Sequence, residues 1–324
     1  MDTNAHRLLP GTCLGPYTVD SELSRSAHSV VYLVQHSRRH SWWALKVFPE
    51  AGARMTERLE REALIRDALR HPNIVPAVEL LDARGVPGLV MEFVEGGTLR
   101  HQLDEWGALP LGSALDLVRG ISAAVAHAHA YDVIHRDLRP ENVLLQPIGP
   151  KQVLPRVVDW GLAKIRDPTG PYGGLTTVQR SLGTPGYAAP EQIRDASSAS
   201  PASDVFALGV LLYELVAGEA PFAGKSELGA ALAARKREFP PLDERCPEAP
   251  QELVALVHRM LDPDPGQRPA DAAEVLDLLP QVDAAPVPVT EEVVARSAAS
   301  WIALLASLPL AAAIMGIVVA AAAR

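Results

Sequence analysis

The stretch His135-Arg-Asp-Leu-Arg-Pro-Glu-Asn-Val-Leu-Leu145 is followed by Asp159-Trp-Gly161, and these two segments decide the fold of this chain. Lys46 and Glu62 lie upstream of them, and Ala189-Pro-Glu191 lies downstream. Each of these residues alone has an ordinary explanation, such as an exposed lysine on a strand, a solvated charge on a helix or an aspartate in a turn. The information lies in their order and spacing within one chain, because chance does not assemble the whole set.

At this order and these gaps, the chain resembles the protein kinase family over about residues 17–280. The segment 135–145 is similar to the family's catalytic loop, and Gly183-Thr-Pro-Gly-Tyr-Ala-Ala-Pro-Glu-Gln192 is similar to the end of its activation segment. The resemblance implies an α+β fold with two lobes, in which a small β-rich N-terminal lobe precedes a larger helical C-terminal lobe.

The patterning of the residues agrees with two lobes. Between residues 17 and 100, short apolar runs predict strands and one helix, whereas residues 111–280 show mostly helical spacing. The expected strands are residues 30–34, 44–48 and 88–94, and the expected helices are residues 57–70, 115–131, 204–216 and 251–261.

The resemblance assigns roles in phosphoryl transfer to five residues. Lys46 would hold the α- and β-phosphates of ATP, and Glu62 would fix its ammonium group. Asp137 would accept the proton of the substrate hydroxyl, while Asn142 and Asp159 would hold Mg²⁺, or Mn²⁺ in its place. These groups position the phosphates and neutralise their charge, which is most of what the reaction requires.

An adenine site is implied by the same resemblance. Val31 and Ala44 would form an apolar roof over the base. Glu92 and Val94 would lie on the hinge strand that reads its edge, and Leu144 completes the expected set of apolar nucleotide-binding positions.

Two arginines near the catalytic loop bear on specificity and control. Arg139 stands where kinases that act on Ser and Thr usually carry Lys, and with Thr184 it favours Ser/Thr specificity; because Arg is a larger planar group, some loss of rate is expected. Arg136 is expected to receive an anion, which predicts a phosphorylated residue on the activation segment. Thr176 and Thr177 are the candidates.

The nucleotide loop departs from the family pattern. Three glycines are expected in this loop, and serines Ser24, Ser26 and Ser29 stand in their place. Glycine lets backbone N–H groups approach phosphates closely, so the serine loop should hold ATP less tightly or in another shape. An inactive or weak pseudokinase, acting as a membrane-docked scaffold, is therefore the alternative to an active kinase. A kinase of small molecules fits less well, because it would not need the activation segment.

A second departure lies beside the metal-binding aspartate. Trp160 replaces the usual Phe, and Arg66, one helical turn after Glu62, stands where an apolar residue is expected. We hypothesise a cation-π contact between Arg66 and the Trp160 ring; the alternative is that Arg66 points to solvent.

Three further charged residues have structural roles by the same resemblance. Glu191 and Arg268 would form a buried ion pair between the activation segment and the large lobe, and Asp204 would anchor the catalytic loop.

Composition limits the class of protein. The chain has 324 residues with 30 Lys and Arg against 39 Asp and Glu, for a net charge of −9. No basic surface dominates, which argues against a nucleic-acid partner. The two cysteines, Cys13 and Cys246, lie far apart and cannot build a disulfide framework or a zinc site, so a reducing compartment is expected.

The C-terminal part changes in composition. Residues 281–297 are a Pro-containing linker, and residues 298–323 carry no charged side chain and have the length of a membrane span, with an Ala-rich buried helix as the alternative. We therefore expect an N-terminal tail (1–16), a kinase domain (17–280), the linker and one transmembrane helix. This arrangement predicts a single-pass protein of the inner or plasma membrane with a cytoplasmic kinase domain, protein substrates at the membrane, and self-association for autophosphorylation in trans.

Overall fold

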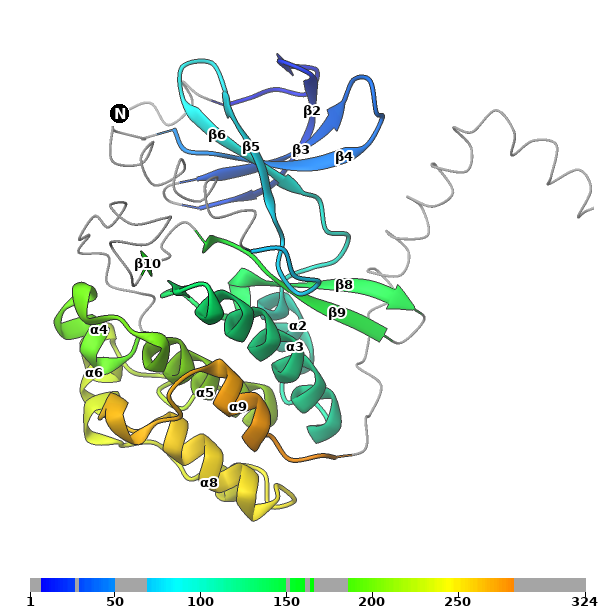
Figure 1. The fold of residues 1–324 in the computed structure, drawn as a ribbon. Helices are drawn as coiled ribbons and strands as arrows, with labels where there is room; N and C mark the ends of the chain where they lie inside the picture. Colours follow the sequence, from blue (N-terminus) through cyan, green and yellow to red (C-terminus); the bar gives the residue numbers. More distant parts are fainter. Residues whose placement is uncertain are drawn as a thin grey trace, which may run out of the picture.

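The computed structural model describes residues 7–26, 29–49, 69–149, 152–160, 164–165 and 186–282. A sheet forms most of the upper lobe and helices form the larger lower lobe (Figure 1). This architecture confirms the expected two-lobed α+β fold.

The upper lobe is one antiparallel sheet. Its strands are β1 (Cys13–Leu14), β2 (Tyr17–Arg25), β3 (Val30–His36), β4 (Trp42–Val47), β5 (Ala77–Asp82) and β6 (Pro87–Glu92), in the spatial order β1-β2-β3-β4-β6-β5. Side chains alternate between the two faces of a strand. Tyr32, Val34, Leu45 and Val90 therefore share one face, where each is at most 1% exposed and contributes to the upper-lobe core.

Residues 8–14, which precede the expected start of the kinase domain at position 17, belong to this lobe. The strand β1 pairs with the start of β2, and Leu8 and Leu14 are buried in the upper-lobe core. The backbone N–H of Leu8 donates to the Tyr32 hydroxyl at 3.2 Å. Residues 8–14 thus pack on the sheet, although the sequence placed them in an N-terminal tail.

The lower lobe is built around a buried helix. Its helices are α2 (Leu99–Trp106), α3 (Leu111–Ala130), α4 (Pro190–Arg194), α5 (Pro201–Ala217), α6 (Glu227–Lys236), α7 (Leu242–Arg245), α8 (Gln251–Met260) and α9 (Ala272–Leu278), with short 3-10 turns η1 (Pro140–Asn142), η3 (Ala196–Ser198) and η4 (Pro265–Gln267). Helix α5 is apolar on almost every face and contacts α3, α8 and α9. A Cβ at Gly209 would lie 2.8 Å from the Met260 Cβ, so glycine permits the close approach of α5 and α8.

Two short strand pairs position the segments between the lobes. Strand β7 (Val133–Ile134) pairs with β10 (Lys164–Ile165), and β8 (Val143–Gly149) pairs with β9 (Gln152–Val157). The connection after β6 packs directly on β8, since a Cβ at Gly96 would lie 2.0 Å from the Leu145 carbonyl oxygen and Gly96 has a φ of +136°. Residues 135–142 therefore lie between β7 and β8, and Asp159 lies just after β9.

Most predicted elements within the described residues are present. The strands expected at 30–34, 44–48 and 88–94 correspond to β3, β4 and β6, and the three expected lower-lobe helices correspond to α3, α5 and α8. The β8–β9 hairpin was not predicted, because Pro147 and Pro155 interrupt both apolar runs and proline usually argues against a strand. Of the helix expected at 57–70, only residues 69 and 70 are described.

The described residues contain no helix that is both long and apolar enough to span a membrane. The span expected at residues 298–323 lies outside the described part of the chain.

Candidate active site

The segment 135–137 is held from below by Asp204 on α5. The Asp204 carboxylate accepts hydrogen bonds from the backbone N–H groups of His135 and Arg136, both at 2.8 Å, and lies 2.9 Å from His129 Nε2. His129 Nδ1 accepts the Ala272 N–H, so its Nε2 carries the proton that Asp204 accepts. Burial alone would raise the pKa of Asp204, but the hydrogen bond from His129 and the backbone N–H donors around residue 135 outweigh it and lower the pKa.

Asp137 and Asn142 face each other across the loop. The Asn142 amide nitrogen donates to the Asp137 carbonyl oxygen at 2.7 Å and to Asp137 Oδ2 at 3.2 Å. Arg139 lies on the other side, with its Nε 3.7 Å from Asp137 Oδ2 and 3.9 Å from Glu141 Oε2. The Asp137 carboxylate is therefore held between an amide donor and a guanidinium.

Asp159 follows β9 in an unusual backbone conformation. Its φ is +67°, a left-handed value that is uncommon for a non-glycine residue. The neighbouring Val158 is fixed from both sides, because its N–H donates to the Asn142 carbonyl oxygen at 2.9 Å and its carbonyl oxygen lies 3.0 Å from His135 Nε2. The loop that carries Asp137 and Asn142 thus also determines where Asp159 lies.

Trp160 packs beneath Asp159. Its ring meets the His135 ring edge-on, with centroids 4.6 Å apart, and the side chain is 2% exposed. Within the described residues the indole N–H has no hydrogen-bond partner. Arg66 lies outside the described residues, so the stacking of Arg66 on Trp160 stays a prediction.

Lys46 joins the upper lobe to the lower one. Its Nζ lies 2.7 Å from Asp159 Oδ2, and the ammonium group also lies 5.4 Å from the centre of the Phe48 ring. The Lys46 side chain is 15% exposed and the Asp159 side chain 25%. The structure therefore brings together two candidate site residues that are more than a hundred positions apart in the sequence.

The expected adenine-binding residues come from the upper-lobe sheet, from the segment after β6 and from β8. Val31 pairs with Lys46 in the β3–β4 register, and Ala44 lies two residues before Lys46, so all three side chains share one face. Leu144 lies on β8, half-buried, and Val94 follows β6 with 4% exposure. The Glu92 carboxylate is bound by Arg156 of β9, with Nη2 to Oε2 at 2.7 Å, so Glu92 offers its backbone rather than its side chain to a ligand.

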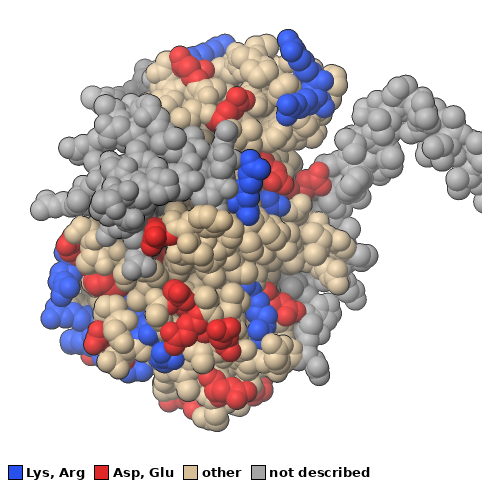
Figure 2. Space-filling view, in the orientation of Figure 1, with Lys and Arg blue, Asp and Glu red and all other residues tan. Residues whose placement is uncertain are grey.

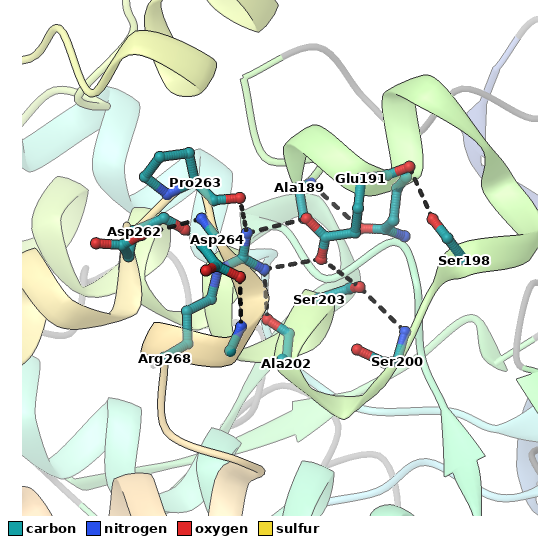
Figure 3. A network of polar contacts seen from close by, with 12 residues as sticks. Ala189, Glu191, Ser198, Ser200, Ala202, Ser203, Asp262, Pro263, Asp264 and Arg268 are labelled. Carbon is teal, nitrogen blue, oxygen red and sulfur yellow. Dashed lines mark hydrogen bonds and ion pairs between the residues drawn. The ribbon is translucent and has the colours of Figure 1, made fainter.

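The predicted structural ion pair is present below the site (Figure 3). Arg268 Nη1 and Nη2 donate to the two Glu191 carboxylate oxygens at 2.8 and 2.9 Å. Glu191 Oε1 also accepts the Ser203 hydroxyl at 2.7 Å. Burial alone would raise the pKa of Glu191, but the Arg268 hydrogen bonds and charge lower it. This pair fixes α4, and with it the end of the activation segment, to the lower lobe.

Two further groups were missed by the sequence analysis. Arg156 bridges β9 to the hinge through Glu92 and to the loop before β5 through the Ile74 carbonyl oxygen at 3.1 Å. Glu214 accepts a hydrogen bond from Arg100 at 2.7 Å and another from the Tyr187 hydroxyl. Periodicity could not find either group, because a polar residue on a strand or helix is usually solvated.

Several predicted residues lie outside the described part of the chain. They are Glu62, Arg66, Thr176, Thr177 and Thr184. Ser24 lies on β2, and Ser26 and Ser29 lie at the turn that joins β2 to β3.

Comparison with known proteins gives the family. Residues 17–278 match the family described as the protein kinase domain. The serine/threonine-protein kinase pkn3 of Myxococcus xanthus is 36% identical over 233 residues, covering 71% of this chain and 42% of the relative. PrkC of Bacillus subtilis is 35% identical over 211 residues (65% of this chain, 31% of PrkC), and myosin light chain kinase A of Dictyostelium discoideum is 34% identical over 228 residues (69% and 75%).

The chain therefore belongs to the protein kinase family, and bacterial serine/threonine kinases are among its relatives. It spans between about a third and two fifths of the length of the bacterial relatives named here.

Proposed function

We propose that this protein is a serine/threonine protein kinase that transfers the γ-phosphate of ATP to protein hydroxyl groups with Mg²⁺ or Mn²⁺. The observation that carries the proposal is the ion pair of Lys46 with Asp159 at 2.7 Å, next to Val158, whose N–H donates to the carbonyl oxygen of Asn142 in the loop that holds the Asp137–Asn142 contact. Lys46 comes from the upper lobe, and Asp137, Asn142 and Asp159 come from the segments between β7 and β10. The family match and the names of the relatives support the same activity.

The donor set fits a magnesium ion. Asn142 directs its amide nitrogen to Asp137, so its amide oxygen and the Asp159 carboxylate would be the ligands of the ion. Among the described residues, no group of three or more His, Cys, Asp or Glu side chains could hold a metal alone. Mg²⁺ binds through one or two protein oxygens together with phosphate oxygens and water, and it would neutralise phosphate charge here.

In the proposed reaction, Asp137 accepts the proton of the substrate hydroxyl while that oxygen bonds to the γ-phosphorus and the bond to the leaving ADP oxygen breaks. Arg139, 3.7 Å from Asp137 Oδ2, supplies positive charge beside the transferred group. Lys46 positions the phosphates, and the specificity for Ser and Thr rests on Arg139 and on the names of the relatives.

The test is phosphate transfer by the full chain in lipid nanodiscs. Wild type with Mg²⁺ and labelled ATP should phosphorylate itself or a generic Ser/Thr substrate, and mass spectrometry should find phosphate on Thr176 or Thr177. Asp137→Asn, folded and nucleotide-bound, should not incorporate label. Absence of transfer in folded wild type that still binds nucleotide would overturn the activity.

A pseudokinase is the second candidate, and one observation favours it. The turn that should face the phosphates has serines at the expected glycine positions, and Ser26 and Ser29 bond to each other. A membrane-docked scaffold of this kind would bind its partner equally well with Asp137→Asn. Equal signalling output from wild type and Asp137→Asn in cells would favour it over the kinase.

We further propose that residues 298–323 anchor the protein as a single helix in the inner or plasma membrane, with the kinase domain in the cytoplasm. The uncharged length of this segment supports the anchor. Anchoring concentrates neighbouring copies, which favours self-association and autophosphorylation in trans. Deleting residues 298–324 should move the protein from the membrane pellet to the supernatant; a truncated protein that still pellets with membranes overturns the anchor.

A further inference from the structure

The turn between β2 and β3 is closed by its own serines. The last register pair of the two strands is Arg25 with Val30. The Ser26 N–H donates to the Ser29 carbonyl oxygen at 2.8 Å, and the Ser29 N–H donates to Ser26 Oγ at 3.0 Å. Ser26 Oγ also lies 3.0 Å from Ser29 Oγ. We call these contacts of Ser26 and Ser29 the serine clasp.

The serine clasp occupies groups that a phosphate-binding loop offers to its ligand. Converging backbone N–H groups are a common means of holding a phosphate. Here the N–H groups of Ser26 and Ser29 already have acceptors inside the turn. A phosphate oxygen that takes either N–H has to displace that acceptor, and the displaced hydrogen bond opposes binding.

The Ser26 hydroxyl is the part of the clasp that a glycine would lack. The bond from the Ser26 N–H to the Ser29 carbonyl oxygen is purely backbone, so any residue at position 26 can make it. The Ser29 N–H, in contrast, reaches a side-chain atom, and removing that hydroxyl releases it.

The positive charge next to the turn is also engaged. Arg25 Nε and Nη2 donate to the two Glu22 carboxylate oxygens at 2.8 and 2.7 Å. This pairing directs the guanidinium back along β2. The Arg25 guanidinium thus does not replace, as a donor to phosphate, the N–H groups that the serine clasp occupies.

We propose that Ser26 lowers the nucleotide affinity of this protein by holding the Ser29 N–H away from the phosphates. This inference rests on the proposed nucleotide binding and adds to it a residue that sets how much nucleotide the protein needs. Because Ser26 acts on binding and not on the bond-making step at Asp137, KM for ATP carries its effect and kcat does not.

The test compares Ser26→Ala and Ser26→Thr in the full chain in nanodiscs, with Ser21→Ala, elsewhere on β2, as the matched control. Equilibrium titration with a fluorescent adenine nucleotide and Mg²⁺ gives Kd, and initial rates give KM and kcat. For Ser26→Ala we expect Kd and KM to fall about 2- to 10-fold, the equivalent of one net hydrogen bond, with kcat unchanged. Ser26→Thr retains the hydroxyl and should keep the wild-type Kd.

Amide hydrogen exchange gives a readout that needs no nucleotide. The Ser29 N–H should exchange faster in Ser26→Ala than in wild type or Ser26→Thr. An unchanged or higher Kd in Ser26→Ala, or no nucleotide binding in any variant, overturns the role of Ser26. A higher Kd would mean that the Ser26 hydroxyl itself binds phosphate. Wild type that binds nucleotide but transfers no phosphate overturns the kinase activity and leaves the effect of Ser26 on Kd to stand.

Discussion

The buried charges of the lower lobe and the charges that join the two lobes are satisfied in different ways. Arg268 is fully buried, and each of its five N–H donors has a protein acceptor, two on Glu191 and three on backbone carbonyls. Lys46 is partly exposed, and within the described residues its three donors meet one carboxylate, that of Asp159. The lower-lobe pair is complete without a ligand, whereas the lobe-joining pair lies partly exposed where the two lobes meet.

This difference separates structural charge from charge that is positioned for chemistry. A buried ion pair is tolerated when hydrogen bonds satisfy both partners, because an unpaired charge in the interior is costly. A binding site works the other way, since its groups must exchange partners when the ligand arrives. Substitutions in the two regions should therefore have different effects. We expect a loss of rate where the lobes meet and a loss of stability at the buried charges of the lower lobe.

The largest effect is expected from Asp137→Asn. The change keeps the shape of the side chain and removes the proton acceptor, so the rate of phosphate transfer should fall by about 10²- to 10⁴-fold while Kd for nucleotide stays within a few-fold. Single-turnover rates and equilibrium titration measure the two quantities. Asp104→Asn, on the exposed side of α2, is the control, and a loss of nucleotide binding equal to the loss of rate would contradict the separation.

Arg268→Ala should give the largest loss of stability. It leaves Glu191 as a buried charge without its partner, which costs about 3–5 kcal/mol in the free energy of unfolding. Urea unfolding followed by tryptophan fluorescence measures it. Arg245→Ala, which removes a surface ion pair with Glu219, should lower the free energy of unfolding by less than about 1 kcal/mol. Equal losses in both variants would show that the buried pair contributes no more stability than the surface pair.

Asp204→Asn tests the anchor of the loop 135–137 and should have an intermediate effect. One amide oxygen replaces two carboxylate oxygens, so either the His135 or the Arg136 N–H loses its acceptor, at a cost of about 1–3 kcal/mol. The same loss should disturb Asp137 and lower kcat without a matching change in Kd. Unfolding curves and kinetics on one preparation test both expectations, and an unchanged kcat would contradict the anchoring role.

The smallest effect is a pH dependence from His71. Burial lowers the pKa of His71, and the neighbouring His127 lowers it further. The unfolded chain therefore binds a proton more readily than the folded one, so stability should fall as the pH drops below about 6.5. His71→Phe should flatten this part of the stability curve, and His101→Phe should not. An identical slope in wild type and His71→Phe would contradict the assignment.

Particular residues show how much of the site can be predicted from the sequence. The motif order singled out Lys46, Asp137, Asn142 and Asp159 as candidate site residues, and the structure shows contacts that this order did not specify, Lys46 with Asp159 and Asn142 with Asp137. The ion pair of Glu191 and Arg268 could be predicted from the resemblance. The link from Arg156 to Glu92 could not, because no periodic pattern distinguishes a buried arginine on a strand from a solvated one.

The serines of the β2–β3 turn also show the difference between what the sequence predicts and what only the structure shows. The sequence indicated that the loop departs from the glycine pattern, but which N–H each hydroxyl engages depends on the register of two strands. Register and hydrogen bonding are set by how whole strands and helices pack, and not by the residues next to one another in the chain.

The sequence by itself determined the family, the two lobes and the residues of the site, because motif order and apolar periodicity are local properties that can be read along the chain. Only the tertiary structure decided that Arg156 binds Glu92, that Arg268 is satisfied at every donor, and that Ser26 bonds the Ser29 N–H. Each of these is a contact whose distance and direction exist only after distant segments have packed together, because a hydrogen bond depends steeply on geometry that the order of residues does not contain.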